Sequence, residues 1–307
     1  MSRRSPTWAS RMSVSDHGAL LRELRTVFAR RTETFTTDDD GLHVTDAAGK
    51  TEEYGLDNLS RAFVEASSAR RPKVVRSFVE SMLEATRTMA ARMEEMADFD
   101  RVRSRVKVRL HPASHVHQPG MDAIVHWTPV EGLIATLVCD FDTFNSSVPR
   151  HILEGWPLSE AEATAFALDN VAAQNPVEVS PQVPGFDVPL FGIERGGPYT
   201  ATHALMLDRV LDGARPLGFI LVIPEASAMA YHPIRDARVH RAMAAMSTLA
   251  ELAYERSANA VSRELFWWHA GRLARVPATR VGERLVIDGT REFGDVVFRG
   301  LAKQSLN

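Results

Sequence analysis

Several features that would place this chain of 307 residues in a particular class are rare or missing. Its one cysteine, Cys139, excludes a disulfide within the chain and a cysteine-rich zinc module. No apolar run approaches the roughly 18–20 residues that cross a bilayer, and the basic first residues have no apolar segment behind them, unlike a secretory signal. The sequence therefore predicts a cytoplasmic protein without a membrane partner.

Charge and nucleotide-binding motifs are equally sparse. The formal net charge is −3, so no overall positive field attracts nucleic acid. The glycine-rich stretch at Gly196-Gly197 lacks both the G-x-G-x-x-G and the Walker pattern. We therefore expect no cofactor, and the composition argues against nucleic acid as a partner.

What the sequence does contain is typical of a globular chain, with 45% hydrophobic and 24% charged residues. Helical and strand patterns are interspersed without strict alternation. Several strand pairs flank tight turns, such as Asp38–Gly41 and His269-Ala270-Gly271. These patterns predict an α+β fold with a mainly antiparallel sheet and packed helices. Leu217–Ile223 is apolar throughout and is expected to be a central strand.

Four parts are expected along the chain. Residues 1–18 are polar and basic and are predicted to form a flexible N-terminal tail. Residues 19–100 would form an N-terminal α/β part with a long helix, and residues 101–277 a central α+β sheet domain. Residues 278–307 would form a C-terminal extension with a hairpin over 283–298, whose turn is Asp288-Gly289.

The long helix is predicted from a stretch without proline or glycine between Pro72 and Pro112. Met82, Met89 and Met96 follow one another at intervals of seven residues, which places them on one face of a helix of about 25 residues. Such a stripe usually packs on a core. Because methionine side chains adapt to different partners, it could instead bind partner helices, so all three methionines are candidates for protein interaction.

Residues 102–110 alternate between apolar and basic side chains, which predicts a strand with one apolar and one basic face. The basic side chains, which include Lys107 and Arg109, are expected to lie on a solvated outer face and to discourage edge pairing. No aromatic residues interleave them for base stacking, so this face is not expected to bind nucleic acid.

A longer pattern begins with the apolar strand Leu133–Cys139, which ends at Asp140. Ser159 and Glu162 then form a capping box at the start of a helix. Further matching positions are Asp38–Gly41, Leu56–Leu59, Ala167, Leu168, Asn170, Gly196, Gly197, Tyr199, Leu217–Pro224 and Gly271. Over roughly residues 19–277 the chain resembles the YtpQ-like family of bacterial proteins, a domain of unknown function. The resemblance implies a fold class and a recurring acid at the position of Asp140, but no activity.

Two groups of residues would suit a metal-dependent hydrolase, the alternative function. His111, His115 and His117 lie close in sequence and could supply zinc ligands. Asp140 and Asp142 alternate at the end of a strand and could bind a divalent cation or divide acid and base roles. An exposed loop would equally explain the histidines, and a carboxylate after a strand often forms a turn.

A small-ligand pocket would be expected near Gly196-Gly197-Pro198-Tyr199-Thr200, which precedes a helix, because free amides at a helix start can hold an anion. A structural turn is the simpler interpretation, since Pro198 removes one amide donor. The candidate pocket residues are Arg195, Gly197, Tyr199, Thr200, His203 and Asp140.

Phe266, Trp267 and Trp268 are expected to lie in one strand, where adjacent side chains face opposite sides. At least one large aromatic would be exposed unless something covers it, and exposed aromatics of this size often mark protein contacts. Packing under the C-terminal extension is the alternative. No group identifies a catalytic residue, so the leading hypothesis is a non-catalytic adaptor or accessory protein that binds another protein or self-associates.

Overall fold

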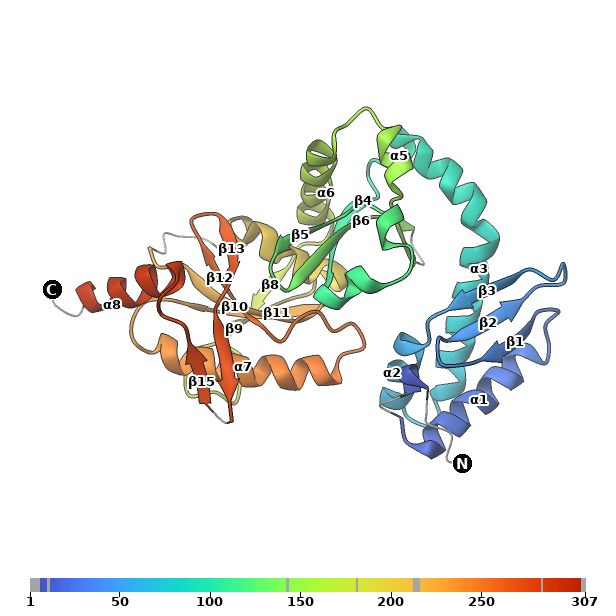
Figure 1. The fold of residues 1–307 in the computed structure, drawn as a ribbon, viewed down its shortest axis with the longest axis horizontal. Coiled ribbons are helices and arrows are strands. Elements are labelled where there is room, and N and C mark those ends of the chain that lie inside the picture. Colours follow the sequence, from blue (N-terminus) through green and yellow to red (C-terminus); the bar gives the residue numbers. More distant parts are fainter. Residues whose placement is uncertain are drawn as a thin grey trace. The chain divides into compact units, whose positions relative to one another are not determined.

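The computed structural model describes residues 6–9, 12–141, 144–180, 182–211, 216–282 and 284–304. Its contacts divide the chain into two compact units, Met1–Arg92 and Met93–Asn307. The chain passes from the first to the second within helix α3 (Arg71–Ala97), which is drawn in cyan to blue-green in Figure 1. The predicted α+β class is confirmed, and every strand pair of the described residues is antiparallel.

The first unit packs three helices against a small sheet. Its elements are η1 (Thr7–Ala9), α1 (Val14–Phe28), β1 (Thr34–Thr37), β2 (Leu42–Thr45), β3 (Thr51–Tyr54), α2 (Asp57–Glu65) and most of α3. The predicted hairpin around Asp38–Gly41 is β1–β2, and β3 adds a third strand beside β2. The helices contribute Leu20, Leu24, Phe63 and Val79 to a core shared with Leu42.

The N-terminal tail is not flexible over its described part. Trp8 is buried in the core of the first unit, and its indole Nε1 donates a hydrogen bond to the carbonyl of Asp38 at 2.8 Å. Helix α1 begins at Val14, behind the side-chain cap of Ser13. The prediction of a flexible tail over residues 1–18 is therefore wrong for Trp8, Ala9 and residues 12–18, and residues 1–5, 10 and 11 lie outside the described part.

The long helix is confirmed as α3, with 27 residues. Its methionine stripe is not an open groove, because Met82 is buried in the core of the first unit and Met96 in a core of the second. Only Met89 is exposed, at 44%. The unit boundary falls at Arg92/Met93 rather than at residue 100, since the last residues of α3 pack with the elements that follow.

The second unit holds two larger sheets and a hairpin. Its elements up to the second sheet are α4 (Phe99–Val102), β4 (Val106–Pro112), η2 (Ala113–His117), η3 (Met121–Ala123), β5 (His126–Val130), β6 (Leu133–Phe141), β7 (Phe144–Ser147), α5 (Arg150–Glu154) and α6 (Glu160–Gln174). The remaining elements are β8 (Glu178–Ser180), β9 (Phe191–Glu194), η4 (Gly197–Arg209), β10 (Phe219–Glu225), β11 (Ala228–Pro233), α7 (Val239–Arg256), β12 (Leu265–His269), β13 (Arg272–Arg275), β14 (Ala278–Val281), β15 (Arg284–Ile287), η5 (Gly294–Phe298) and α8 (Arg299–Gln304).

The six-stranded sheet has the order β13-β12-β10-β11-β9-β8, so β10 is central as predicted. Alternate residues of β10 enter two cores. Phe219 and Leu221 pack toward the four-stranded sheet, in which β6 lies between β4 and β5 and also pairs with β7. Ile220 and Val222 pack toward α7, which lies along the other face of the six-stranded sheet (Figure 1).

The aromatic strand is not an interaction surface. Phe266, Trp267 and Trp268 are all buried in β12, because both faces of the six-stranded sheet are covered. Phe266 and Trp268 face the core shared with the four-stranded sheet, and Trp267 faces α7. The indole Nε1 of Trp267 donates to the carbonyl of Leu217 at 2.9 Å, and its ring meets Phe293 of the C-terminal segment edge-on.

The C-terminal extension contains a hairpin, but not at the predicted position. Strands β14 and β15 pair over residues 278–287, and the following segment is helical. Asp288 makes side-chain bonds to Thr290 at the start of that segment and does not form the turn of the hairpin. Phe293, Val297 and Leu301 join the core beneath α7, so the extension packs as part of the second unit.

Candidate functional site

Strand β4 carries the residues from which the candidate site is built. Val106, Val108 and Leu110 face the core, so the alternation of a strand places Lys107 and Arg109 on the opposite face. Arg101 and Arg103, which precede the strand, are exposed as predicted. The predicted solvation is wrong for the strand itself, because Lys107 is buried and the Nε atom of Arg109 is also buried. We call Lys107, Arg109, Asp140, Asn145 and Tyr199 the Arg109 cluster; its members come from β4, β6, β7 and η4.

Lys107 and Asp140 form an ion pair within this cluster. Lys107 Nζ lies 2.9 Å from Asp140 Oδ2, and the two side chains are 7% and 27% exposed. The ammonium also lies 4.7 Å from the centroid of the Tyr199 ring, which is a favourable cation–π distance. The charge of Lys107 is therefore compensated by one carboxylate and one aromatic face.

Asp140 does not form the expected turn. It lies inside β6, which continues to Phe141, and its backbone N–H donates to the carbonyl of Arg105 at 2.9 Å. Asp142, the second carboxylate of the predicted acidic pair, lies outside the described residues.

Tyr199 comes from η4, a 3-10 helix that begins with Gly197 and Pro198. Its hydroxyl donates to Asn145 Oδ1 at 2.8 Å. Burial and the nearby charge of Asp140 raise the pKa of the Tyr199 phenol, which therefore stays protonated and acts as a donor.

Arg109 is the member of the cluster without a partner. Its buried Nε has no hydrogen-bond acceptor, and no ion pair to Arg109 is formed by the described residues. Burial lowers the pKa of the guanidinium, while Tyr199 and Asp140 act in the opposite direction. Since an arginine keeps its charge in proteins, this is a partly buried positive charge that lacks a counter-charge of its own.

Two histidines extend the same face. The rings of His111 and His115 stack at 4.0 Å with an interplanar angle of 3°, and His111 Nε2 lies 3.0 Å from Thr136 Oγ1. Burial, then the charges of His115 and Arg109, lowers the pKa of His111 to about 2. Burial also lowers the pKa of His115, so both rings are neutral at pH 7.

This arrangement does not suit a metal. Nitrogen lone pairs lie in the ring plane, so two parallel stacked rings direct them alongside each other rather than toward one ion. His117 is exposed at the end of η2. Within the described parts of the chain, no group of three or more histidine, cysteine, aspartate or glutamate side chains is placed to hold a metal ion.

Of the six residues predicted to form a small-ligand pocket, Tyr199 and Asp140 come together in the Arg109 cluster, and the other four do not join them. Arg195 is exposed and pairs with Glu178, with Nε and Oε2 3.0 Å apart. Gly197 lies at the surface with a left-handed φ of 59°. Thr200 is buried and donates to the carbonyl of Gly197 at 3.1 Å. His203 is buried with its Nε2 2.9 Å from the carbonyl of Asn175, and burial lowers its pKa.

Lys107, Arg109 and Asn145 were not predicted as site residues, although one signal pointed to the two basic residues. The partner strand β6 is apolar on both faces, which is typical of a strand covered on both sides. Register places Val138 opposite Lys107 and Thr136 opposite Arg109, and both of these β6 residues are buried. Basic residues in the strand that pairs with β6 are therefore expected to be covered by the same neighbouring elements.

The chain matches no protein-family model, no curated protein and no solved structure. The resemblance to the YtpQ-like family therefore stays a prediction. Among the described residues, no helix has the length and apolar character needed to cross a bilayer.

Proposed function

We propose that this protein binds a small anion, a carboxylate or a phosphate ester, at the Arg109 cluster. The observation that carries this proposal is the buried Nε of Arg109, which has no acceptor. Arginine presents a planar set of N–H donors that matches a carboxylate or phosphate in a bidentate manner, and buried donors without acceptors are rare in proteins.

The charge balance of the cluster supports an anionic ligand. Among its described members there are two cations, Lys107 and Arg109, and one carboxylate, Asp140, which is bound to Lys107. A charge removed from water without a counter-charge is costly, so an anion beside Arg109 would recover part of that cost. Arg109 as a whole remains partly exposed, which leaves a route for a small solute.

The neighbouring groups favour binding over proton-transfer chemistry. Tyr199 is a protonated donor, and His111 and His115 are neutral rings that can each donate one N–H. Cys139 is buried on the core face of β6, and burial raises its pKa to about 12, so it is not an activated thiolate. The proposal is therefore a ligand-binding protein without a catalytic step.

Thermal unfolding in the presence of different anions tests the proposal. Inorganic phosphate, phenyl phosphate, acetate and benzoate would be compared at constant ionic strength. At least one should raise the melting temperature of the wild type in a saturable manner, because a ligand that binds only the folded state stabilises it. Arg109→Met should abolish this rise, whereas Arg76→Met, which changes an exposed arginine of the first unit, should not. An equal rise in the wild type and Arg109→Met would contradict the proposal.

The protein-interaction hypothesis is a second proposal, supported by a different feature. Val281 and Val286 are 62% and 52% exposed on the two-stranded hairpin β14–β15, whose outer edges pair with no other described strand. Open edges beside exposed β-branched residues favour strand addition by a partner, including a second copy of the chain. Light scattering should detect a dimer that Val281→Thr/Val286→Thr dissociates. A monomeric wild type at high concentration would contradict self-association.

A further inference from the structure

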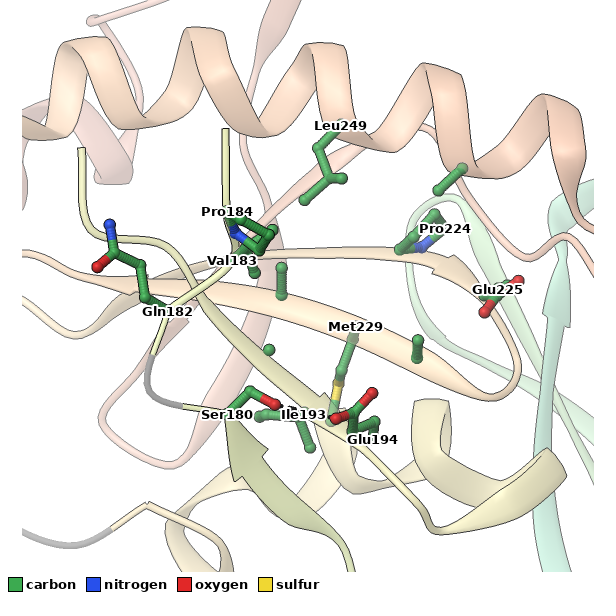
Figure 2. A pocket seen from close by; sticks show the side chains of 14 residues that line it. Ser180, Gln182, Val183, Pro184, Ile193, Glu194, Pro224, Glu225, Met229 and Leu249 are labelled. Carbon is green, nitrogen blue, oxygen red and sulfur yellow. Dashed lines mark hydrogen bonds between the residues drawn. The ribbon is translucent and has the colours of Figure 1, made fainter. Parts of the chain in front are cut away.

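A pocket separate from the Arg109 cluster lies between helix α7 and the six-stranded sheet. Its volume is about 350 Å³, within the range of roughly 300–1,000 Å³ found for small-ligand sites. Figure 2 shows Leu249 reaching from α7 toward the strands, with Val183 and Pro184 at one end and Pro224 and Glu225 at the other. None of the residues of the Arg109 cluster lines it.

The pocket exists because its floor is made of small residues. Gly192 of β9 pairs with Ala230 of β11 on one side and with Ser180 of β8 on the other, and all three line the pocket. Packed layers lie about 10 Å apart, and large side chains normally fill the space between them. Three small residues in a row therefore leave space beneath α7.

Gly192 is not explained by backbone geometry. Its φ lies outside the left-handed region, and the register with β11 is continuous, so no bulge requires a glycine here. A Cβ at this position would lie at ordinary contact distances, 3.4 Å from Ser180 Cβ and 3.8 Å from Val183 Cγ2. Glycine weakens a strand interior, and one that no bulge or bend requires often marks the close approach of a ligand or of another backbone segment.

The charge at one end of the pocket selects the class of ligand. Ala228 is the strand partner of Glu194 on β9 and, beyond an irregularity in β10, of Glu225. The two glutamates therefore flank one end of the floor, with their Cα atoms about 10 Å apart, two strand spacings. Each accepts a hydrogen bond from a serine, Ser180 at 2.9 Å and Ser227 at 3.0 Å. Neither forms an ion pair with another described residue, whereas the nearby Arg195 is bound to Glu178.

We infer that this pocket binds a small organic amine, with its apolar body under Leu249 and its ammonium group over Ala228 between Glu194 and Glu225. This site goes beyond the proposed anion site and does not depend on it. The apolar wall from Leu249, Ala253 and Pro184 would take up the hydrocarbon part, and the two carboxylates would supply the counter-charge.

Three probes of equal length test the ligand class: hexylamine, hexan-1-ol and hexanoate. The readout is the methyl NMR spectrum, in which Val183 and Leu249 report on the pocket and Val79, in the core of the first unit, serves as the control. Hexylamine should shift the Val183 and Leu249 methyls with a Kd below about 10 mM, and about tenfold more tightly than the other two compounds. Absence of saturable binding, or equal affinity for the three probes, would overturn the inference.

Two kinds of variant test the role of the carboxylates and the role of the empty space separately. Glu194→Gln/Glu225→Gln should remove the preference for the amine, while Glu154→Gln, at an exposed glutamate on α5, should retain it. Gly192→Val should weaken hexylamine binding at least tenfold without lowering the melting temperature, because its branches occupy the empty space. Ala228→Leu provides a second way of filling the pocket should Gly192→Val fold poorly. Unchanged hexylamine binding in a folded filling variant would overturn the inference.

Discussion

Removal of the Asp140 carboxylate should destabilise the second unit through Lys107. In Asp140→Ala the ammonium of Lys107, only 7% exposed, would lose the carboxylate oxygen that lies 2.9 Å away. Leaving one partner of a buried pair uncompensated typically costs about 3–5 kcal/mol. Asp140 itself is 27% exposed, so water can partly replace it, and we expect a loss near the lower end, about 3 kcal/mol.

A second substitution, at Lys107, tests whether the unpaired ammonium causes the loss of stability in Asp140→Ala. Lys107→Met removes the charge but keeps an unbranched chain that can pack against the Tyr199 ring. In the double variant no unpaired charge remains, so Lys107→Met/Asp140→Ala should be more stable than Asp140→Ala alone. The coupling energy from the complete cycle should be about 2–3 kcal/mol in favour of the native pair.

Urea unfolding followed by tryptophan fluorescence measures the cycle. Four of the five tryptophans, Trp127, Trp156, Trp267 and Trp268, belong to the second unit, so the signal reports mainly on that unit. Additive losses in the double variant would refute the reasoning, as would a loss below about 1 kcal/mol for Asp140→Ala. A rise in stability in Asp140→Ala would instead indicate that the carboxylate serves a ligand.

Two further predictions concern burial. The pKa of His111 is about 2 in the folded state, below the ordinary value of 6.5, so the unfolded state binds more protons in that window and stability is lost as the pH falls below 6.5. Between pH 6.5 and 4.5 this contribution amounts to about 2.5 kcal/mol. His111→Gln does not titrate and should reduce the pH dependence of the unfolding free energy by that amount; an unchanged dependence would contradict the burial of His111. Trp267→Ala should cost about 4 kcal/mol in urea unfolding, because Trp267 is a core residue, whereas a loss below about 1 kcal/mol would restore the surface interpretation.

Local elements with their own chemical signals could be predicted from the sequence. Ser159 and Glu162 make the reciprocal capping box at the start of α6. The turn between β12 and β13 has left-handed φ values at Ala270 and Gly271, as expected for a tight hairpin. These features depend on residues close together in the chain, so no tertiary information is needed to find them.

Burial could not be predicted in the same way, because it depends on how many layers cover a strand or helix. Trp267 and Trp268 face opposite sides of β12, and each side has its own core. Met82 and Met96 share a face of α3 but pack in different units. The spacing of apolar residues shows which faces of a helix or strand are apolar. Whether each face is buried depends on segments that are distant in the sequence.

The candidate site was only half predictable for the same reason. Asp140 and Tyr199 were identified from strand-end and turn patterns, and the basic face of β4 from its alternation. What was missed is that η4, about ninety residues after β4, brings Tyr199 over Lys107 and encloses the basic face. The unpaired state of Arg109 is a property of that assembled environment and has no local sequence signal.

The most direct test of anion binding at Arg109 observes its guanidinium. A two-dimensional ¹⁵N–¹H spectrum of the arginine Nε–H groups would be recorded during titration with the anion that most raises the melting temperature. The Arg109 signal would be assigned by its absence in Arg109→Met. We predict that this signal shifts and saturates with the same Kd as the thermal effect, because the anion supplies the acceptor that Nε lacks. A stationary Arg109 signal, with the response at another arginine, would contradict the account.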